Sequence, residues 1–282
     1  MNTFLSPKLS QQHAERCAEE LIKRLGISAL PISPAEIAKR HDILLQPMAQ
    51  TEPGISGFLM KAGDRFGIGY STRIKNEGLI NFTLGHELGH YFLPGHIDFL
   101  FQDNQGFHYS RSGFVSAEPH EKEADYFSAA LLMPGFLFLP ALRRAGKGVA
   151  AISQLAAKCR TSLTATAIRY AQIAEDPVAV IITAGNQIEV CVLSNSLKEI
   201  RGVTGLSKGE FLPAGTPTEK FNMDVNNAGS ANSTASFTSL DDWFESAPQV
   251  EMNEDVVGLG GYGKTLTVLF SDKLIEDEED DE

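Results

Sequence analysis

Apolar residues recur at helical spacing near the start of the chain, from Ala14 to Leu25. Ser6-Pro7 before this run and Gly26 after it predict a helix that begins at the proline and ends before the glycine. Ser33-Pro34-Ala35-Glu36 has the form of a capping box, so a second, short helix is expected to run to about Arg40. The apolar residues 43–45 then predict a strand.

The period changes between residues 54 and 70. Apolar residues on both sides of a turn at residues 61–64, with alternation after it, predict a β-hairpin. A helix is expected to begin at Asn81 or Thr83 and to end at Pro94-Gly95. Residues 95–118 show no clear period, and we interpret them as a long loop. Pro119 opens a helical pattern through Met133, and helical signals continue to about residue 174.

Strand patterns dominate after residue 176. Residues 178–182 and 188–193 predict a second hairpin around Gly185-Asn186, and residues 264–270 alternate as a strand. Residues 224–239, rich in Asn, Ser and Thr, are interpreted as a loop or as an insert that orders on demand. Trp243 is assigned to the core of this part.

These patterns predict an α+β protein in four parts. Residues 1–145 form a domain of helices with a small β-sheet, and residues 146–175 form a helical extension that resembles a helix-turn-helix. Residues 176–274 form an α+β C-terminal domain, rich in strands, whose role the sequence leaves open between a sensor and a structural module. Residues 275–282 form an acidic, disordered tail.

Composition and charge narrow the class of protein. The 282 residues are 43% hydrophobic and 21% charged, which is typical of a folded globular chain. The net charge is −12, but residues 276–282 are all acidic and the rest of the chain carries only −5. An acidic body disfavours broad contact with DNA or an anionic membrane. Three scattered cysteines, no signal-peptide pattern and no apolar stretch of about 18 residues predict a cytoplasmic protein.

His86-Glu87-Leu88-Gly89-His90 carries the strongest chemical signal in the chain. On a helix, residues four apart share a face, so His86 and His90 can bind one metal ion. Glu87 lies near enough to act on a water of that ion without displacing it. A catalytic zinc site has three protein ligands and an open position, so a third ligand is required.

The helix predicted after Pro119 offers that ligand. Glu121 and Asp125 are four residues apart and share a face, whereas Glu123 points about 200° away from Glu121 on the helical wheel. One carboxylate would bind the metal, and the other would accept the N–H of a ligating histidine and fix its tautomer. The ligand set suits Zn²⁺ and also accommodates Mn²⁺ or Fe²⁺.

The two motifs together resemble the ImmA/IrrE metallo-endopeptidases, which share the zincin-like, gluzincin-type arrangement of HExxH followed by ExxxD. Residues 83–90 and 121–134 carry the resemblance, which extends over about residues 10–174. It implies metal ligands at His86, His90 and Glu121, and a catalytic base at Glu87. The family often has Asn where this chain has Asp125, so the orienting role of Asp125 rests on the gluzincin pattern.

The resemblance also implies a substrate: a helix-turn-helix repressor of the XRE type, whose cleavage derepresses stress-response or mobile-element genes. Two alternatives remain open, a regulatory protein that docks a repressor without cutting it and a general cytoplasmic peptidase. Oligomeric state is not addressed by the sequence. The strands at residues 55–60 or 66–70 are candidates for binding an extended substrate at a sheet edge. Candidates for the donor to the oxyanion remain Tyr91, His96, His108, Tyr109 and His120.

Two further motifs compete with this interpretation. Gly258 to Thr265 fits the P-loop pattern GxxxxGKT, but an alternating strand follows it and only 17 residues remain, so nucleotide binding is not expected. Residues 150–174 have helix-turn-helix form, but Lys158, Arg160 and Arg169 are few basic groups for a DNA-reading face. We therefore expect no direct DNA binding.

Overall fold

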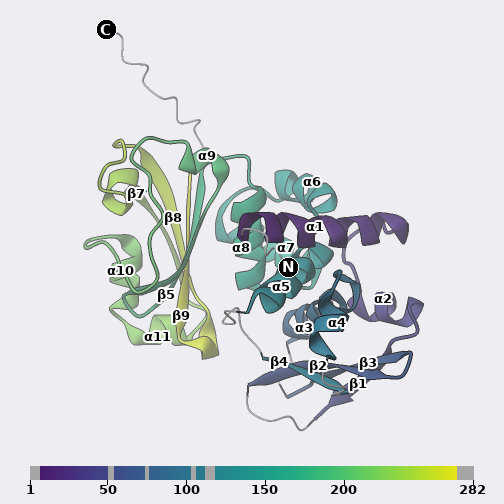
Figure 1. The fold of residues 1–282 in the computed structure, drawn as a ribbon. Coiled ribbons are helices and arrows are strands. Elements are labelled where there is room, and N and C mark those ends of the chain that lie inside the picture. The colour runs from purple at the N-terminus through teal and green to yellow at the C-terminus, as the bar shows by residue number, and fades with distance from the viewer. Residues whose placement is uncertain (1–6, 50–53, 74–75, 103–105, 112–117, 272–282) are drawn as a thin grey trace. The chain divides into compact units, whose positions relative to one another are not determined.

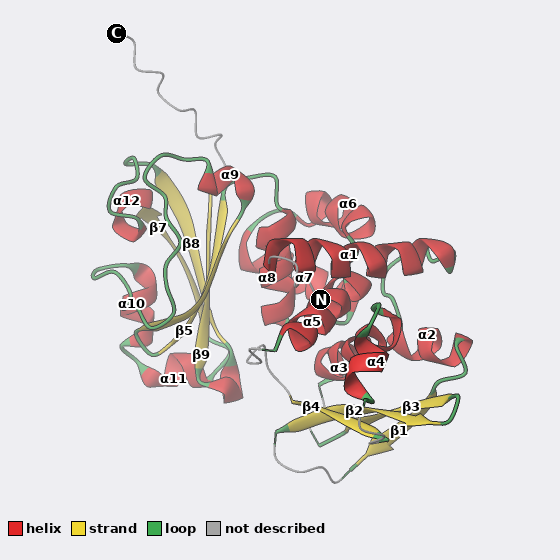
Figure 2. Cartoon of the chain, in the orientation of Figure 1, coloured by secondary structure: helices red, strands yellow, loops and turns green. Residues whose placement is uncertain are grey.

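The computed structural model describes residues 7–49, 54–73, 76–102, 106–111 and 118–271. The chain divides into two compact units. The first comprises Met1–Pro140 and Ala156–Ser162, and the second comprises Ala141–Leu155 and Leu163–Glu282. Each unit contains helices and one β-sheet, as Figures 1 and 2 show. The predicted α+β class is therefore confirmed.

The first unit is built on a four-stranded mixed sheet of order β1-β3-β2-β4, in which β1 and β3 are parallel and the other pairs are antiparallel. Helices α3 and α4 lie over one face of this sheet (Figure 1). Its elements are α1 (Pro7–Arg24), α2 (Pro34–Arg40), β1 (Leu44–Met48), β2 (Ile55–Ala62), β3 (Arg65–Ser71), α3 (Glu77–Phe92), α4 (His96–Leu100), β4 (Phe107–Arg111) and α5 (Pro119–Leu132). Helices α6 (Gly135–Ala145) and α7 (Gly148–Cys159) cross the division between the units.

Helix α3 is the central element of this unit. Leu59 and Ile68 of the sheet, Leu88 of α3, and Phe127 and Leu131 of α5 are all fully buried in one core. Burying side chains of this size contributes roughly 1.5–3 kcal/mol each to folding. The core therefore fixes α3 between the sheet on one side and α5 on the other.

Most of the predicted elements in this unit are present. The hairpin of β2 and β3 is confirmed, with Ala62 paired to Arg65 next to the turn. The short helix predicted to reach Arg40 does so, and the Ser33 side chain accepts a hydrogen bond from the Glu36 N–H as its cap. Helix α1 begins at Pro7, while the expected cap, Ser6, lies outside the described residues.

Helix α3 begins earlier than predicted. Its first residue is Glu77, and the side chain of Asn76 caps it by accepting a hydrogen bond from the Leu79 N–H. The expected start at Asn81 or Thr83 was wrong because those residues lie inside the helix. Asn81 instead donates from its side chain to the carbonyl oxygen of Arg160.

The expectation of a long loop at residues 95–118 was wrong in part. Residues 96–100 form α4, and residues 107–111 form β4, which pairs with β2 at the edge of the sheet. Phe107 and Tyr109 alternate with His108 and Ser110, so a strand period was present in the sequence. Residues 103–105 and 112–117 lie outside the described part of the chain.

The suggested substrate-binding edges were also wrong. The strands at residues 55–60 and 66–70 correspond to β2 and β3, and both are interior strands with a partner on each side. Within the described residues, the edges of this sheet are β1 and β4.

The second unit contains a five-stranded antiparallel sheet of order β6-β5-β9-β8-β7. Trp243 is buried against it, as predicted. The elements are α8 (Leu163–Ile173), β5 (Val178–Ala184), β6 (Gln187–Leu193), α9 (Asn195–Lys198), α10 (Pro217–Asn222), α11 (Val225–Gly229), β7 (Ser233–Ser239), α12 (Leu240–Trp243), β8 (Glu251–Gly258), the 3-10 turn η1 (Gly260–Tyr262) and β9 (Lys264–Phe270).

Two segments of the second unit test specific predictions. Residues 224–239 are not a loop, because they form α11 and the edge strand β7, whose residues are mostly exposed and therefore need few apolar side chains. The P-loop pattern lies in the connection between β8 and β9, and Lys264 begins a strand rather than a helix. The rejection of a nucleotide site at this motif therefore agrees with the local fold.

Among the described helices, none is by itself long and apolar enough to cross a membrane, and α5 with α6 meets that test only as a pair bent by 58°.

Candidate metal centre

Two glycines of α3 bring it against α5. A Cβ on Gly85 would lie 2.5 Å from the Ser128 Oγ, and one on Gly89 would lie 3.0 Å from the Cα of Ala124. The Ser128 hydroxyl also donates to the carbonyl oxygen of Phe82 at 2.8 Å. Side chains between these glycines therefore meet the N-terminal half of α5 at short range.

The structure brings together the three predicted ligands. His86, His90 and Glu121 offer ligand atoms that all lie within 4.8 Å of one another. The two Nε2 atoms are 3.0 Å apart, and the carboxylate oxygens of Glu121 lie 3.4 Å from the Nε2 of His86 and 3.3 Å from that of His90. Ligands about 2.0–2.1 Å from a tetrahedral zinc would be separated by roughly 3.3–3.4 Å. The donor set and its spacing therefore fit a small divalent ion.

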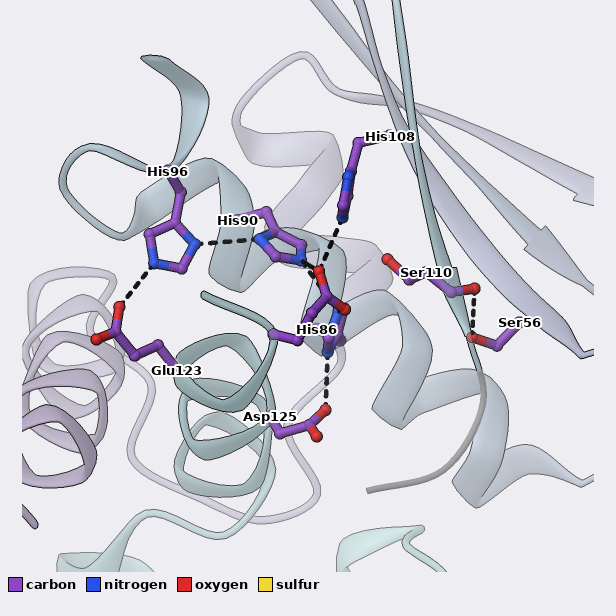
Figure 3. Close-up of polar contacts among 9 residues, drawn as sticks. Ser56, His86, His90, His96, His108, Ser110, Glu123 and Asp125 are labelled. Atoms are coloured by element: carbon purple, nitrogen blue, oxygen red, sulfur yellow. Dashed lines mark hydrogen bonds and ion pairs between the residues drawn. The ribbon is translucent and has the colours of Figure 1, made fainter. Parts of the chain in front are cut away.

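Asp125 lies where the sequence predicted an orienting group. Its Oδ1 is 2.8 Å from the Nδ1 of His86 (Figure 3). The hydrogen bond places the ring proton on Nδ1 and leaves Nε2 free to bind a metal. Both groups are largely buried, so the ring orientation is held without competition from solvent.

Charge in the cluster is arranged for a cation. Although burial raises the pKa of Glu121, hydrogen bonds from His108, His86 and His90 hold it well below its usual range. Burial lowers the pKa of His90 to about 3, so this ring is neutral, which is the form that ligates metals. Burial also lowers the pKa of His86, but the carboxylates of Asp125 and Glu121 raise it to about 10. Metal binding would therefore release a proton from His86.

Glu87 is the buried acid of the site. It is fully inaccessible to solvent, and neither carboxylate oxygen has a well-formed hydrogen bond within the described residues. Burial raises the pKa of Glu87 to about 7. A Cβ on Gly57 of β2 would lie 3.1 Å from the Oε1 of Glu87, so this glycine leaves room for the carboxylate. An unsatisfied buried carboxylate is costly, and it is typical of a group kept ready for proton transfer.

Strand β4 supplies two residues of the site that the loop interpretation could not place. The Nε2 of His108 lies 2.9 Å from the Oε1 of Glu121. The Ser110 hydroxyl lies close enough to Glu87 to lower its pKa against the effect of burial. Alternation along β4 points both side chains to the helix-covered face.

The structure distinguishes the candidates for an oxyanion donor. Tyr91 packs edge-on against Phe66, and His120 stacks on Phe99 with ring centroids 4.0 Å apart. Tyr109 is 56% exposed, and His96 contacts the far side of His90. Of the five, His108 alone contacts a predicted metal ligand on the side where β4 borders the site.

A sequence model of a known family, described as the IrrE N-terminal-like domain of the M78 peptidases, matches residues 38–170. This segment contains His86, Glu87, His90, Glu121 and Asp125. The chain carries a peptidase domain of the ImmA/IrrE family. The family assignment made from the two motifs is therefore confirmed, and the ImmA/IrrE domain is of metallopeptidase type.

The other comparisons concern the fold. A solved structure described as a Mycobacterium tuberculosis transcriptional regulator is similar to this chain with a TM-score of 0.58 and 14% sequence identity. The similarity covers 92% of this chain and 76% of that one. At this identity the likeness concerns the fold alone. No curated protein matches the chain.

Proposed function

We propose that this protein is a zinc-dependent endopeptidase that cleaves a helix-turn-helix repressor of the XRE type, and so derepresses stress-response or mobile-element genes. The observation that carries the peptidase part is Glu87, buried and unsatisfied beside His86, His90 and Glu121. The choice of a repressor as substrate is supported by membership of the ImmA/IrrE family. The cytoplasmic location proposed from the sequence suits such a substrate.

The proposed chemistry follows from the positions of the side chains. His86, His90 and Glu121 would hold the ion, which supplies Lewis acidity and lowers the pKa of a water towards about 7. Glu87 accepts the proton of the attacking water and returns it to the leaving amine. His108 donates a hydrogen bond from Nε2 to the carbonyl oxygen as negative charge develops there.

Strand β4 is the proposed edge for an extended substrate. It has one neighbour, β2, within the described residues, so its other side offers backbone donors and acceptors. His108 and Ser110 on β4 lie at Glu121 and Glu87. A peptide added along β4 would therefore pass the site, whereas β1 forms the opposite edge of the sheet.

The experiment is a cleavage assay with purified helix-turn-helix repressors of the XRE type from the same organism. The wild type with zinc should yield two fragments that define one bond by mass spectrometry, and a chelator should stop the reaction. Glu87→Gln should reduce the rate by roughly 10²–10⁴-fold while zinc and the repressor remain bound. Glu20→Gln, at a largely exposed position on α1, is the matched control and should cleave like the wild type.

Two other outcomes would contradict the proposal. If Glu87→Gln still relieves repression in cells, the protein acts by docking rather than by proteolysis. If the wild type cuts short unrelated peptides as fast as the repressor, it is a general peptidase.

A further inference from the structure

A series of polar contacts lies behind His90, on the side away from Glu121, and is buried between His90 and His96. The Nδ1 of His90 is 3.1 Å from the Nδ1 of His96, and the Nε2 of His96 is 2.9 Å from the Oε2 of Glu123. Figure 3 shows these contacts in sequence from His90 to Glu123. The other carboxylate oxygen of Glu123 accepts a hydrogen bond from the Ser10 hydroxyl of α1.

A tight turn after α3 places His96 close to that helix. Helix α3 ends at Phe92, and Gly95 adopts a left-handed conformation with φ 81°, which turns the chain back at the start of α4. His90 and His96 are both fully buried, with no exposed surface. Buried polar groups are nearly always hydrogen-bonded, so the contact between these two imidazoles is expected to be a hydrogen bond.

The contacts allow a single proton arrangement when His90 binds a metal. A ligating Nε2 carries no proton, so neutral His90 has its proton on Nδ1 and donates to the Nδ1 of His96. His96 must then be unprotonated at Nδ1 and protonated at Nε2, from which it donates to Glu123. Every donor in the series His90–His96–Glu123 then has an acceptor, and the last acceptor is the Glu123 carboxylate.

The two ligating histidines therefore differ in their support. Asp125 accepts directly from His86, whereas a carboxylate reaches His90 only through a second imidazole. We propose that His96 and Glu123 are positioning residues that hold the metal ligand His90 in its tautomer and orientation. This inference rests on the proposed metal site, and it gives Glu123 a role although its helical phase excludes it as a ligand.

The test measures affinity for zinc alone, by competition with a chromophoric chelator, in the full-length chain without substrate. His96→Leu removes the acceptor for His90 and should weaken zinc binding by roughly 10–100-fold. His96→Asn is the matched control, because its side-chain oxygen can accept from His90 near the position of Nδ1. The asparagine variant should bind zinc with a Kd within about threefold of that of the wild type. A threefold change in Kd is comparable to the variation in the free energy that one neutral hydrogen bond contributes.

A thermodynamic cycle separates positioning from simple packing. If Glu123 acts through His96, Glu123→Ala should weaken zinc binding in the wild type but add nothing in the His96→Leu background. Additive losses, equal losses in the Leu and Asn variants, or wild-type affinity in His96→Leu would each overturn the proposal.

A second readout needs no variant. Nitrogen-15 spectra of the zinc-loaded wild type should show His96 as the tautomer protonated at Nε2, and the opposite tautomer would overturn the assignment. Failure of the proposed peptidase function can be distinguished from failure of this inference. In that case the wild type would bind zinc and the variants would lose affinity as predicted, but the wild type would cut no peptide bond. A wild type that binds no zinc would overturn both.

Discussion

Two glutamates, one in each unit, are fully buried but differ in what surrounds their carboxylates. Glu254 of β8 accepts hydrogen bonds from the Thr218 N–H and hydroxyl at 2.7 and 2.6 Å, and from the Trp243 Nε1–H at 2.9 Å. Glu87 of α3 has no comparable partner within the described residues. Burial of an acid is therefore not by itself a sign of function. What indicates function is a buried acid that lacks hydrogen-bond partners and lies beside a cluster of side chains able to bind a metal.

The partners of Glu254 explain why we assign it a structural role. Thr218 lies on α10 and Trp243 on α12, so one carboxylate ties two helices to the sheet of the second unit. The Thr218 hydroxyl oxygen also accepts a hydrogen bond from the Thr267 hydroxyl of β9 at 2.7 Å. The comparison with Glu87 predicts that the same substitution should have opposite effects on stability at the two positions.

The largest expected effect on stability is that of Glu254→Gln. In either orientation the amide NH₂ faces a donor, Thr218 or Trp243, so a buried donor loses its acceptor and the protein should lose roughly 2–4 kcal/mol of unfolding free energy. Chemical denaturation measures this loss. Glu251→Gln, exposed on the same strand, is the control and should change stability little. A neutral effect at Glu254 would remove the contrast between the two acids.

Glu87→Gln should stabilise the metal-free protein by an amount that grows as pH rises from about 4.5 to about 7 and stays constant above that range. Because folded Glu87 binds its proton more tightly than unfolded Glu87, the wild type loses stability as pH rises from about 4.5 to about 7. That change of pKa corresponds to at most about 3 kcal/mol. Thermal unfolding of both proteins at pH 5 and pH 8 tests the prediction. A stability difference that does not depend on pH would contradict it.

Asp125, like Glu254, is a carboxylate with a hydrogen-bond partner, the Nδ1 of His86. Asp125→Ala removes the acceptor for the Nδ1 of His86 and should weaken zinc binding by roughly 10–100-fold. Asp125→Asn keeps an oxygen acceptor, so its loss should be several times smaller. Chelator competition measures both affinities, and equal losses would show that the hydrogen bond is not what orients His86.

The smallest expected effect comes from Ser110. Its hydroxyl opposes the rise in the pKa of Glu87, so Ser110→Ala should move the pH-dependent loss of stability to higher pH. One neutral hydrogen bond limits the change to less than about 1.5 kcal/mol. Unfolding midpoints measured across pH would show the shift, and a shift to lower pH would contradict the proposed contact with Glu87.

The sequence predicted the parts of the site that depend on local periodicity. His86 and His90 share a face because they are four residues apart on a helix, and Glu121 and Asp125 do so for the same reason. The positions of these residues follow from helix geometry, and their close approach follows from Gly85 and Gly89.

The parts that were missed depend on contacts between elements. His108 reaches Glu121 because β4 pairs with β2, a partner about fifty residues earlier in the chain. The alternation of Phe107 to Ser110 signalled a strand, but five residues give a weak signal. Helical phase correctly separated Glu123 from the ligand face, and its contact with His96 depends on a turn at Gly95 that no periodicity describes.

The proposed metal site is tested most directly by an anomalous difference map at the zinc absorption edge from crystals grown with zinc. We predict one strong peak in the first unit, within about 2.0–2.2 Å of the Nε2 atoms of His86 and His90 and of a carboxylate oxygen of Glu121. The carboxylate of Glu87 should lie near the peak without binding it. A peak at other residues, direct ligation by Glu87, or no peak at this cluster would contradict the proposed metal site.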